Sequence, residues 1–184
     1  DQTSMSINKT KMFSLIRLNY FNEFGKNEKL EKVFTEFDKV YKPSNKTFSG
    51  KHKKYHALVE FENSLEDSSL PLFDQCTHEL YYTGGISIVD ETIPAQYAFV
   101  TEINKGKTRT SANVYSLSKG TNIPIKVGAK LYRNVEFDVG DMVFIGSTKV
   151  KPKPTKIDGQ WGSHPTEKEV WIEDMKTIRK GTKK

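Results

Sequence analysis

The spacing of the apolar residues changes part-way along this chain, and this change constrains the fold more than any other feature. In the N-terminal part, apolar side chains such as Leu30, Val33 and Phe37 recur every three or four residues, as they do along an α-helix with one buried face. Further along, Ile123 and Ile125 alternate with other residues, which is typical of a half-buried β-strand. The sequence therefore predicts an α+β fold.

The helical pattern covers residues 1–42 and has a break in its middle. Ser6 or Asn8 is suited to cap a first helix, and Asn27 is suited to cap a second one after a turn. Pro43 ends the pattern. We therefore predict a helical hairpin over residues 1–42.

The rest of the chain divides by composition. Residues 43–78 are polar, basic and turn-rich, and we predict a linker there, followed by a connector over residues 79–94. Residues 95–180 read as three short strands, a short helix and two further strands, which is the order of an OB-like β-barrel. Residues 181–184 form a basic tail.

The basic side chains are concentrated in the C-terminal half. Residues 1–94 hold 12 basic and 14 acidic side chains, whereas residues 95–184 hold 17 basic and 9 acidic ones. No carboxylate occurs between Glu102 and Glu136. Such a stretch favours an anionic partner with a phosphate backbone, although a well-solvated surface would have the same composition.

Several side chains in this half are candidates for contacting a nucleic acid. Lysines and arginines would follow the phosphates, and tyrosines would stack on bases unless they belong to the core. We favour the loop over residues 104–111 most, and we interpret the segment KVKPKPTK as a proline-stiffened turn that contacts the backbone without reading bases. The candidate nucleic-acid-binding residues are Lys105, Lys107, Arg109, Tyr115, Lys119, Lys130, Tyr132, Arg133, Lys149, Lys151 and Lys153.

Catalytic signatures are missing from the sequence. Acidic residues occur as neighbours, such as Glu173 with Asp174, and in an extended chain neighbours point to opposite faces rather than holding two metal ions together. Cys76 is the single cysteine, which rules out a disulfide within the chain and a zinc site of several thiolates. We expect no enzyme activity from this chain alone, no metal and no cofactor.

The chain has no apolar run of the roughly 20 residues that a bilayer requires, and its first residues do not resemble a signal peptide. Together with the single cysteine, this favours a reducing, cytoplasmic location and no membrane partner. The chain begins with Asp1 rather than methionine, so we expect it to be a piece of a longer protein.

Three segments resemble, in the right order, the C-terminal part of bacterial or phage family C DNA polymerases, the DNA polymerase III alpha subunit family. Met12–Phe37 resembles the helical segment after the catalytic core, and His78–Asp90 resembles the segment before the OB domain. Residues 96–104, 123–145 and 168–178 resemble the strands and helix of that domain. The resemblance implies a non-catalytic, DNA-binding part of a replicative polymerase, with the rest of the polymerase as a partner.

The chain departs from the family at two places. Gly84, Gly85 and Ile86 replace a Gly-His-Pro phrase, and the chain stops soon after the barrel, which puts clamp-loader binding in doubt. The segment SLPLF resembles the family's sliding-clamp peptide but lacks its glutamine. Its candidate clamp-contacting residues are Leu70, Leu72 and Phe73, which could equally be buried in the protein.

Two other functions remain open at this point. The chain could be a freestanding adaptor that docks on a replication protein through its helical hairpin or SLPLF, without touching DNA. It could also be an independent single-strand-binding protein. The sequence does not distinguish DNA from RNA, and it gives no strand polarity or oligomeric state.

Overall fold

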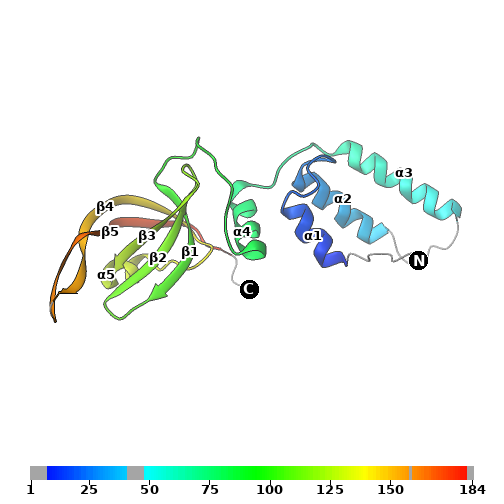
Figure 1. Cartoon of the computed structure of the whole chain (residues 1–184). Coiled ribbons are helices and arrows are strands. Elements are labelled where there is room, and N and C mark those ends of the chain that lie inside the picture. Colours follow the sequence, from blue (N-terminus) through cyan, green and yellow to red (C-terminus); the bar gives the residue numbers. More distant parts are fainter. Residues whose placement is uncertain (1–7, 41–47, 158, 182–184) are drawn as a thin grey trace. The chain divides into compact units, whose positions relative to one another are not determined.

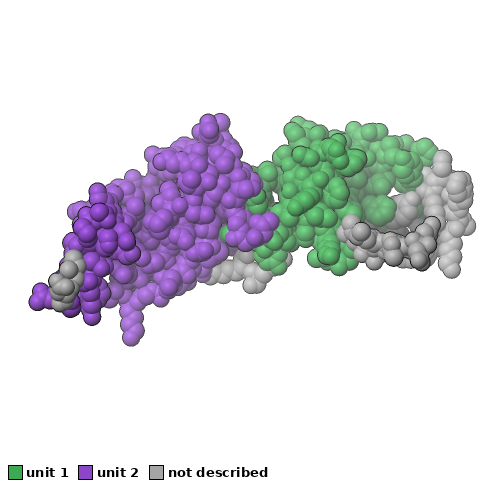
Figure 2. Space-filling model, in the orientation of Figure 1, with its two compact units in different colours: residues 1–82 green, residues 83–184 purple. Residues whose placement is uncertain are grey.

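The computed structural model describes residues 8–40, 48–157 and 159–181. These residues contain five helices and a five-stranded mixed sheet, so the α+β class predicted from the sequence is confirmed (Figure 1). The chain divides into two compact units, residues 1–82 and residues 83–184, which Figure 2 colours separately. In the described part of the chain, no helix is long and apolar enough to cross a membrane.

The N-terminal unit is helical. Phe13 and Phe34 pack edge to face with their ring centroids 4.9 Å apart, and this contact joins the first two helices. Such an aromatic pair adds stability beyond the area it buries. The helices are α1 (Lys9–Arg17), α2 (Asn27–Val40), α3 (Phe48–Ser64) and α4 (Leu72–Thr83).

The two predicted helix caps have different outcomes. Asn8 caps α1, because its side-chain oxygen accepts the backbone N–H of Lys11 at 2.9 Å. Asn27 does not cap α2 in this way. Its side chain is buried, and its Oδ1 accepts the backbone N–H of Leu70 at 2.8 Å. Asn27 therefore ties α2 to the segment that precedes α4.

The linker predicted over residues 43–78 is wrong for most of its length, because α3 occupies Phe48–Ser64 and α4 begins at Leu72. Residues 43–47 lie outside the described residues. The α3 sequence contains three lysines, two glutamates, one alanine and one leucine, which are good helix formers, and it contains no proline. The predicted boundary between residues 78 and 79 falls inside α4, whereas the compact unit ends at Tyr82.

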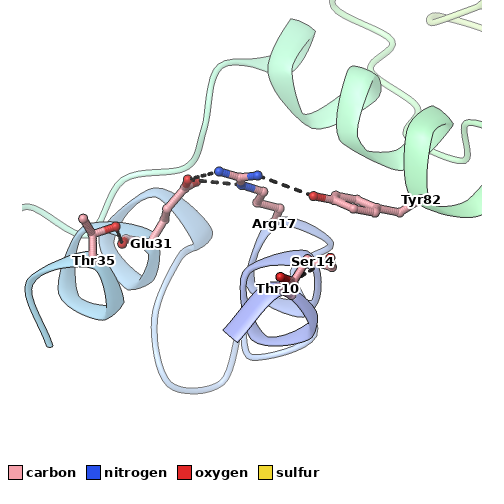
Figure 3. A network of polar contacts seen from close by, with 6 residues as sticks. All are labelled: Thr10, Ser14, Arg17, Glu31, Thr35 and Tyr82. Atoms are coloured by element: carbon pink, nitrogen blue, oxygen red, sulfur yellow. Dashed lines mark hydrogen bonds and ion pairs between the residues drawn. The ribbon is translucent and has the colours of Figure 1, made fainter. Parts of the chain in front are cut away.

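A polar network joins three helices of this unit (Figure 3). The Arg17 guanidinium donates to Glu31 Oε1 from Nε at 3.1 Å and from Nη2 at 2.6 Å, and Nη1 donates to the Tyr82 hydroxyl at 3.4 Å. The hydrogen bond to Glu31 raises the pKa of Arg17 further above its usual value. Arg17 thus connects α1 to both α2 and α4.

The C-terminal unit is a β-barrel. Its strands are hydrogen-bonded in the order β1-β2-β3-β5-β4, and β4 returns to β1, so the sheet closes on itself. Among the strands that the structure describes, the β3–β5 pair is parallel and the other pairs are antiparallel. The strand and helix order predicted from the sequence is confirmed. The elements are β1 (Tyr97–Lys105), β2 (Arg109–Ser116), β3 (Thr121–Gly128), α5 (Ala129–Val135), β4 (Met142–Ile157) and β5 (Gln160–Arg179).

Alternate residues of each strand fill the barrel. Val114, Ile125, Val127 and Val143 belong to one buried cluster that Phe137 also joins. Because side chains alternate along a strand, the residues between these point to the outside of the barrel. A ligand would contact the barrel on that outer surface.

Strands β4 and β5 continue well beyond the rest of the barrel as a long hairpin (Figure 1). The segment KVKPKPTK, interpreted as a turn, is instead part of β4 and pairs with β5. Its prolines coincide with an irregularity, since the register shifts between Pro152 and Pro154. Proline lacks the N–H that a regular ladder needs, which explains why the pairing is interrupted there.

Candidate nucleic-acid interface

A row of side chains crosses the outer face of the barrel on four neighbouring strands. Ser111 of β2 pairs with Lys126 of β3, Lys126 pairs with Trp171 of β5, and Trp171 pairs with Lys149 of β4. Directly paired residues share a face and lie close together. The Lys126 ammonium donates to Ser111 Oγ at 2.8 Å. Trp171 therefore has a lysine as its paired residue on each neighbouring strand.

The loop between β1 and β2 lies beyond one end of this row. Gly106 donates its N–H to the carbonyl of Arg109 at 3.0 Å, which closes a tight turn. A Cβ at Gly106 would lie 2.6 Å from that same oxygen, so the turn requires glycine. Lys107 is exposed in the loop, and Arg109 begins β2. The segment favoured from the sequence, residues 104–111, thus turns tightly and holds three cations, Lys105, Lys107 and Arg109.

Glu169 of β5 lies among the cations of this face. Its Oε1 is 3.9 Å from Lys126 Nζ, and its Oε2 is 3.9 Å from an Arg109 terminal nitrogen. The Glu169 side chain is only 11% exposed, and Oε2 is buried without a hydrogen-bond partner in the described structure. A carboxylate held at these distances partly neutralises two cations without satisfying its own oxygen.

Residues 103–135 contain no carboxylate, but in the folded protein carboxylates from other segments lie beside their cations. Lys105 Nζ lies 3.3 Å from Asp138 Oδ2 and 5.7 Å from the centre of the Tyr132 ring. Tyr132 and then Asp138 raise the pKa of Lys105. Both Asp138 and Glu169 come from segments outside residues 103–135 and approach only after folding.

Beside the row, an open depression of about 450 Å³ lies between α5 and the β4–β5 hairpin. Lys130, Lys151 and Trp171 line it together with Glu173. The Lys151 ammonium lies 4.7 Å from the centre of the Trp171 ring, within the range of a cation–π contact. The depression thus combines an aromatic surface with two ammonium groups.

Neither of the two tyrosines predicted to stack on bases presents a fully exposed ring. Tyr115 is buried, with 3% exposure, so its ring is not available to a base. Tyr132 is half-buried, donates its hydroxyl proton to the Phe137 carbonyl at 3.1 Å, and packs edge to face on the Phe137 ring. Tyr132 therefore covers the barrel core.

The remaining predicted cations do not all lie on one face. Lys119 is in the β2–β3 turn, at the opposite end of β2 from Lys107, because successive turns of a meander lie at opposite ends. Arg133 is exposed on α5, and its Nε donates to the Ala129 carbonyl at 3.3 Å. Lys153 is on the outer part of the β4–β5 hairpin. Only part of the predicted set is gathered around the row.

The segment SLPLF is not an extended peptide in the structure. Leu72 and Phe73 begin α4, and Phe73 is buried. The Leu70 carbonyl accepts the Gln75 side-chain N–H at 2.6 Å. Because all three predicted anchors belong to helix α4 or to the turn tied to it, the geometry favours the interpretation that they are structural.

The sequence interpretation missed both tryptophans of this unit, of which Trp161 is exposed and Trp171 is half-buried. Trp161 and Trp171 each lie beside a lysine, with Lys156 facing Trp161 and Lys151 facing Trp171. Lys126 was also missed, although it lies in the middle of the row. The available signal was the occurrence of two tryptophans in a polar, lysine-rich stretch, where burial of an indole is not expected.

In the described residues, no group of three or more His, Cys, Asp or Glu side chains could hold a metal ion. Comparison with known proteins identified no matching family model, no similar curated protein and no similar solved structure. Function is therefore inferred from the residues and their geometry.

Proposed function

We propose that this chain is a non-catalytic DNA-binding segment of a replicative DNA polymerase. It holds single-stranded template or primer-template DNA on the outer face of its barrel. The observation that carries the proposal is the row in which Trp171 lies between Lys126 and Lys149. Lysines on both sides of an aromatic surface suit a strand whose bases stack while its phosphates meet cations.

The strand order supports an OB-like assignment. In OB folds, five strands form a Greek-key barrel, and the face of strands 2 and 3 with the loops between strands 1 and 2 and strands 4 and 5 binds oligonucleotides. Here the row crosses β2 and β3, the β1–β2 loop carries Lys107, and the β4–β5 hairpin carries Lys149 and Lys151. The polymerase context rests on the sequence resemblance.

The binding chemistry would be independent of base sequence. Lysine and arginine contact phosphates, and an indole stacks on any base because every base has a π-face. Arg109 and Lys126 would exchange their contact with Glu169 for contact with a phosphate. Binding of this kind weakens as salt rises, since each neutralised phosphate releases counterions.

A salt titration tests the proposal. Affinity for a labelled oligothymidylate, measured by fluorescence anisotropy, should fall with salt. Lys126→Ala should flatten the log–log slope by about 0.7, the value for one phosphate contact on a single strand. Trp171→Ala should weaken binding by about 1 to 3 kcal/mol at every salt concentration and leave the slope unchanged.

Lys176→Ala is the matched control, because Lys176 is exposed on β5 but pairs with Phe144 rather than with the row. The control should behave as the unchanged chain. Absence of salt-dependent binding at low ionic strength would refute the interface. The purified chain should also fail to extend a primer with any divalent metal, and extension above a contaminant control would refute the non-catalytic assignment.

A second candidate function is the adaptor role, which a groove on the N-terminal unit favours. This groove has a volume of about 480 Å³ and is lined, among the described residues, by apolar side chains from α1, α2, α3 and the turn after α1. Phe24 on its wall is 68% exposed. If the oligonucleotide titration fails, the adaptor role becomes the leading hypothesis.

A further inference from the structure

The outer end of the β4–β5 hairpin carries a second tryptophan–lysine pair. Trp161 is 73% exposed, the largest exposed fraction among the large apolar side chains described. It pairs across the hairpin with Lys156, whose ammonium lies 5.6 Å from the centre of the indole ring. Most of the indole ring is exposed to solvent. Exposure of a large apolar ring is energetically unfavourable, so such a ring often marks a binding site.

A polar bulge lies in the outer part of the hairpin. On β4 only Lys153 lies between Pro152 and Pro154, whereas on β5 residues 164–167 lie between their partners Lys168 and Ser163. The extra residues fold around His164, whose Nδ1 accepts the backbone N–H of Glu167 at 2.9 Å and that of Thr166 at 3.3 Å.

An ion pair closes this bulge from the other strand. Lys153 Nζ lies 2.6 Å from Glu167 Oε2. The contact with Glu167 raises the pKa of Lys153, and the contact with Lys153 lowers the pKa of Glu167. Both groups therefore stay charged across the neutral range, and the ion pair adds a contact between the two strands of the hairpin.

The distance between the two tryptophan–lysine pairs sets the length of nucleic-acid strand that could contact both. Trp171 pairs with Lys149 and Trp161 pairs with Lys156. At about 3.3 Å per residue, seven steps along β4 span at most about 23 Å. This span corresponds to about seven steps of a stacked strand at 3.4 Å each. A short oligonucleotide on the barrel face would not reach the hairpin end, but a longer one would.

The charge around Trp161 favours a polyanion over a protein or lipid partner. From Lys151 and its partner Glu169 outward, the described residues of the hairpin include four lysines, Lys151, Lys153, Lys156 and Lys168, and two carboxylates, Glu167 and Glu169. The apolar surface is a single ring beside an ammonium group, whereas a protein or bilayer contact needs a larger apolar patch. A base on the ring with phosphates near the lysines satisfies both features.

We propose that the outer β4–β5 hairpin is a second stacking site for a single-stranded nucleic acid, with Trp161 as its platform and Lys156 and Lys153 as its phosphate contacts. This inference rests on the proposed function, because the same nucleic-acid strand also lies on the barrel face. The hairpin extends the length of strand that the chain binds without adding any preference for base sequence.

The chain contains two tryptophans, so each can be observed alone. Trp171→Phe leaves Trp161 as the reporter, and Trp161→Phe leaves Trp171. An oligothymidylate of about 5 nucleotides should quench the fluorescence of Trp171 alone, and one of about 15 nucleotides should quench both, within the range of strand lengths that OB folds bind. Trp161→Ala should weaken binding of the longer strand by about fivefold or more and leave the shorter strand unaffected.

An abasic strand of the same length separates stacking from charge. It should bind through its phosphates but leave Trp161 unquenched. If the longer strand binds and quenches Trp171 while Trp161 stays unquenched, the hairpin inference is wrong and the barrel interface stands. If neither tryptophan responds and anisotropy shows no binding, the proposed function is wrong. Quenching of Trp161 by anionic lipid vesicles but not by oligonucleotides would instead make the hairpin a membrane contact.

Discussion

Replacing Glu169 by glutamine should strengthen nucleic-acid binding. Glu169 lies 3.9 Å from both Arg109 and Lys126, so its charge lies next to the cations that an incoming phosphate would approach. Glutamine keeps the size of the side chain and removes the charge. Two cations are then released for phosphates, and a repulsive interaction with the ligand disappears.

The size of the effect follows from the removed repulsion. A carboxylate about 8 Å from a phosphate repels it by about 0.5 kcal/mol in water and by about 2 kcal/mol at the effective dielectric constant of a protein surface. The expected gain in affinity is therefore about two- to thirtyfold at low salt. Because Arg109 and Lys126 contact phosphates in both the unchanged chain and the variant, the slope of log affinity against log salt should change little.

The assay is an anisotropy titration of labelled oligothymidylate at several salt concentrations. Glu91→Gln is the matched control, since Glu91 is exposed in the same unit, changes the net charge equally and forms no ion pair among the described contacts. Circular dichroism checks that both variants fold. Equal gains for the two variants would show that only net charge matters, and this result would remove Arg109 and Lys126 from the interface.

Three further predictions concern other residues. Lys107→Ala with Arg109→Ala should flatten the salt slope for single-stranded DNA by up to about 1.4, and an unchanged slope would exclude the β1–β2 loop. Tyr115→Phe should leave binding intact, whereas Tyr115→Ala should cost about 3 to 5 kcal/mol of stability in urea unfolding because its ring is buried. Burial raises the pKa of the Cys76 thiol from its usual value near 9 to about 12, so a thiol reagent should label the native chain at pH 8 only slowly. The stability that this neutral thiol contributes is complete below about pH 9 and is lost as the pH approaches 12. Phe73→Ala, three residues earlier on α4, should speed the labelling, and unchanged labelling would return Phe73 to the list of docking candidates.

The features predictable from the sequence are those that depend on local pattern. The Asn8 cap, the order of strands and the short helix over residues 129–135 each follow from residues that lie near one another in the chain. Helix α3 is also locally encoded, although its lysines and histidines are equally typical of a polar linker. Leu58 and Phe61, three residues apart and both half-buried, were the helical signal in that stretch.

The features that could not be predicted depend on residues far apart in sequence. Alternation along β2 places Tyr115 on the outer side of the strand, opposite Val114, and this predicts an exposed ring. In the structure, however, Tyr115 is buried on that outer side. Nothing within β2 indicates that cover. In the same way, the row of Lys126 and Trp171 exists because β3 pairs with β5, and these strands are separated by a helix and by the whole of β4.

Before a ligand binds, the cations of the interface contact different kinds of groups, and this difference affects the order in which they would bind a strand. Arg109 and Lys126 face a carboxylate, so a phosphate must displace Glu169 before it gains their charge. Lys151 and Lys156 lie over indole rings instead. An aromatic ring attracts an ammonium group without cancelling its charge, so these two lysines still attract phosphates at a distance. First contact with a strand is therefore expected on the β4–β5 hairpin, and engagement of the carboxylate-held cations on the barrel face follows as the strand settles.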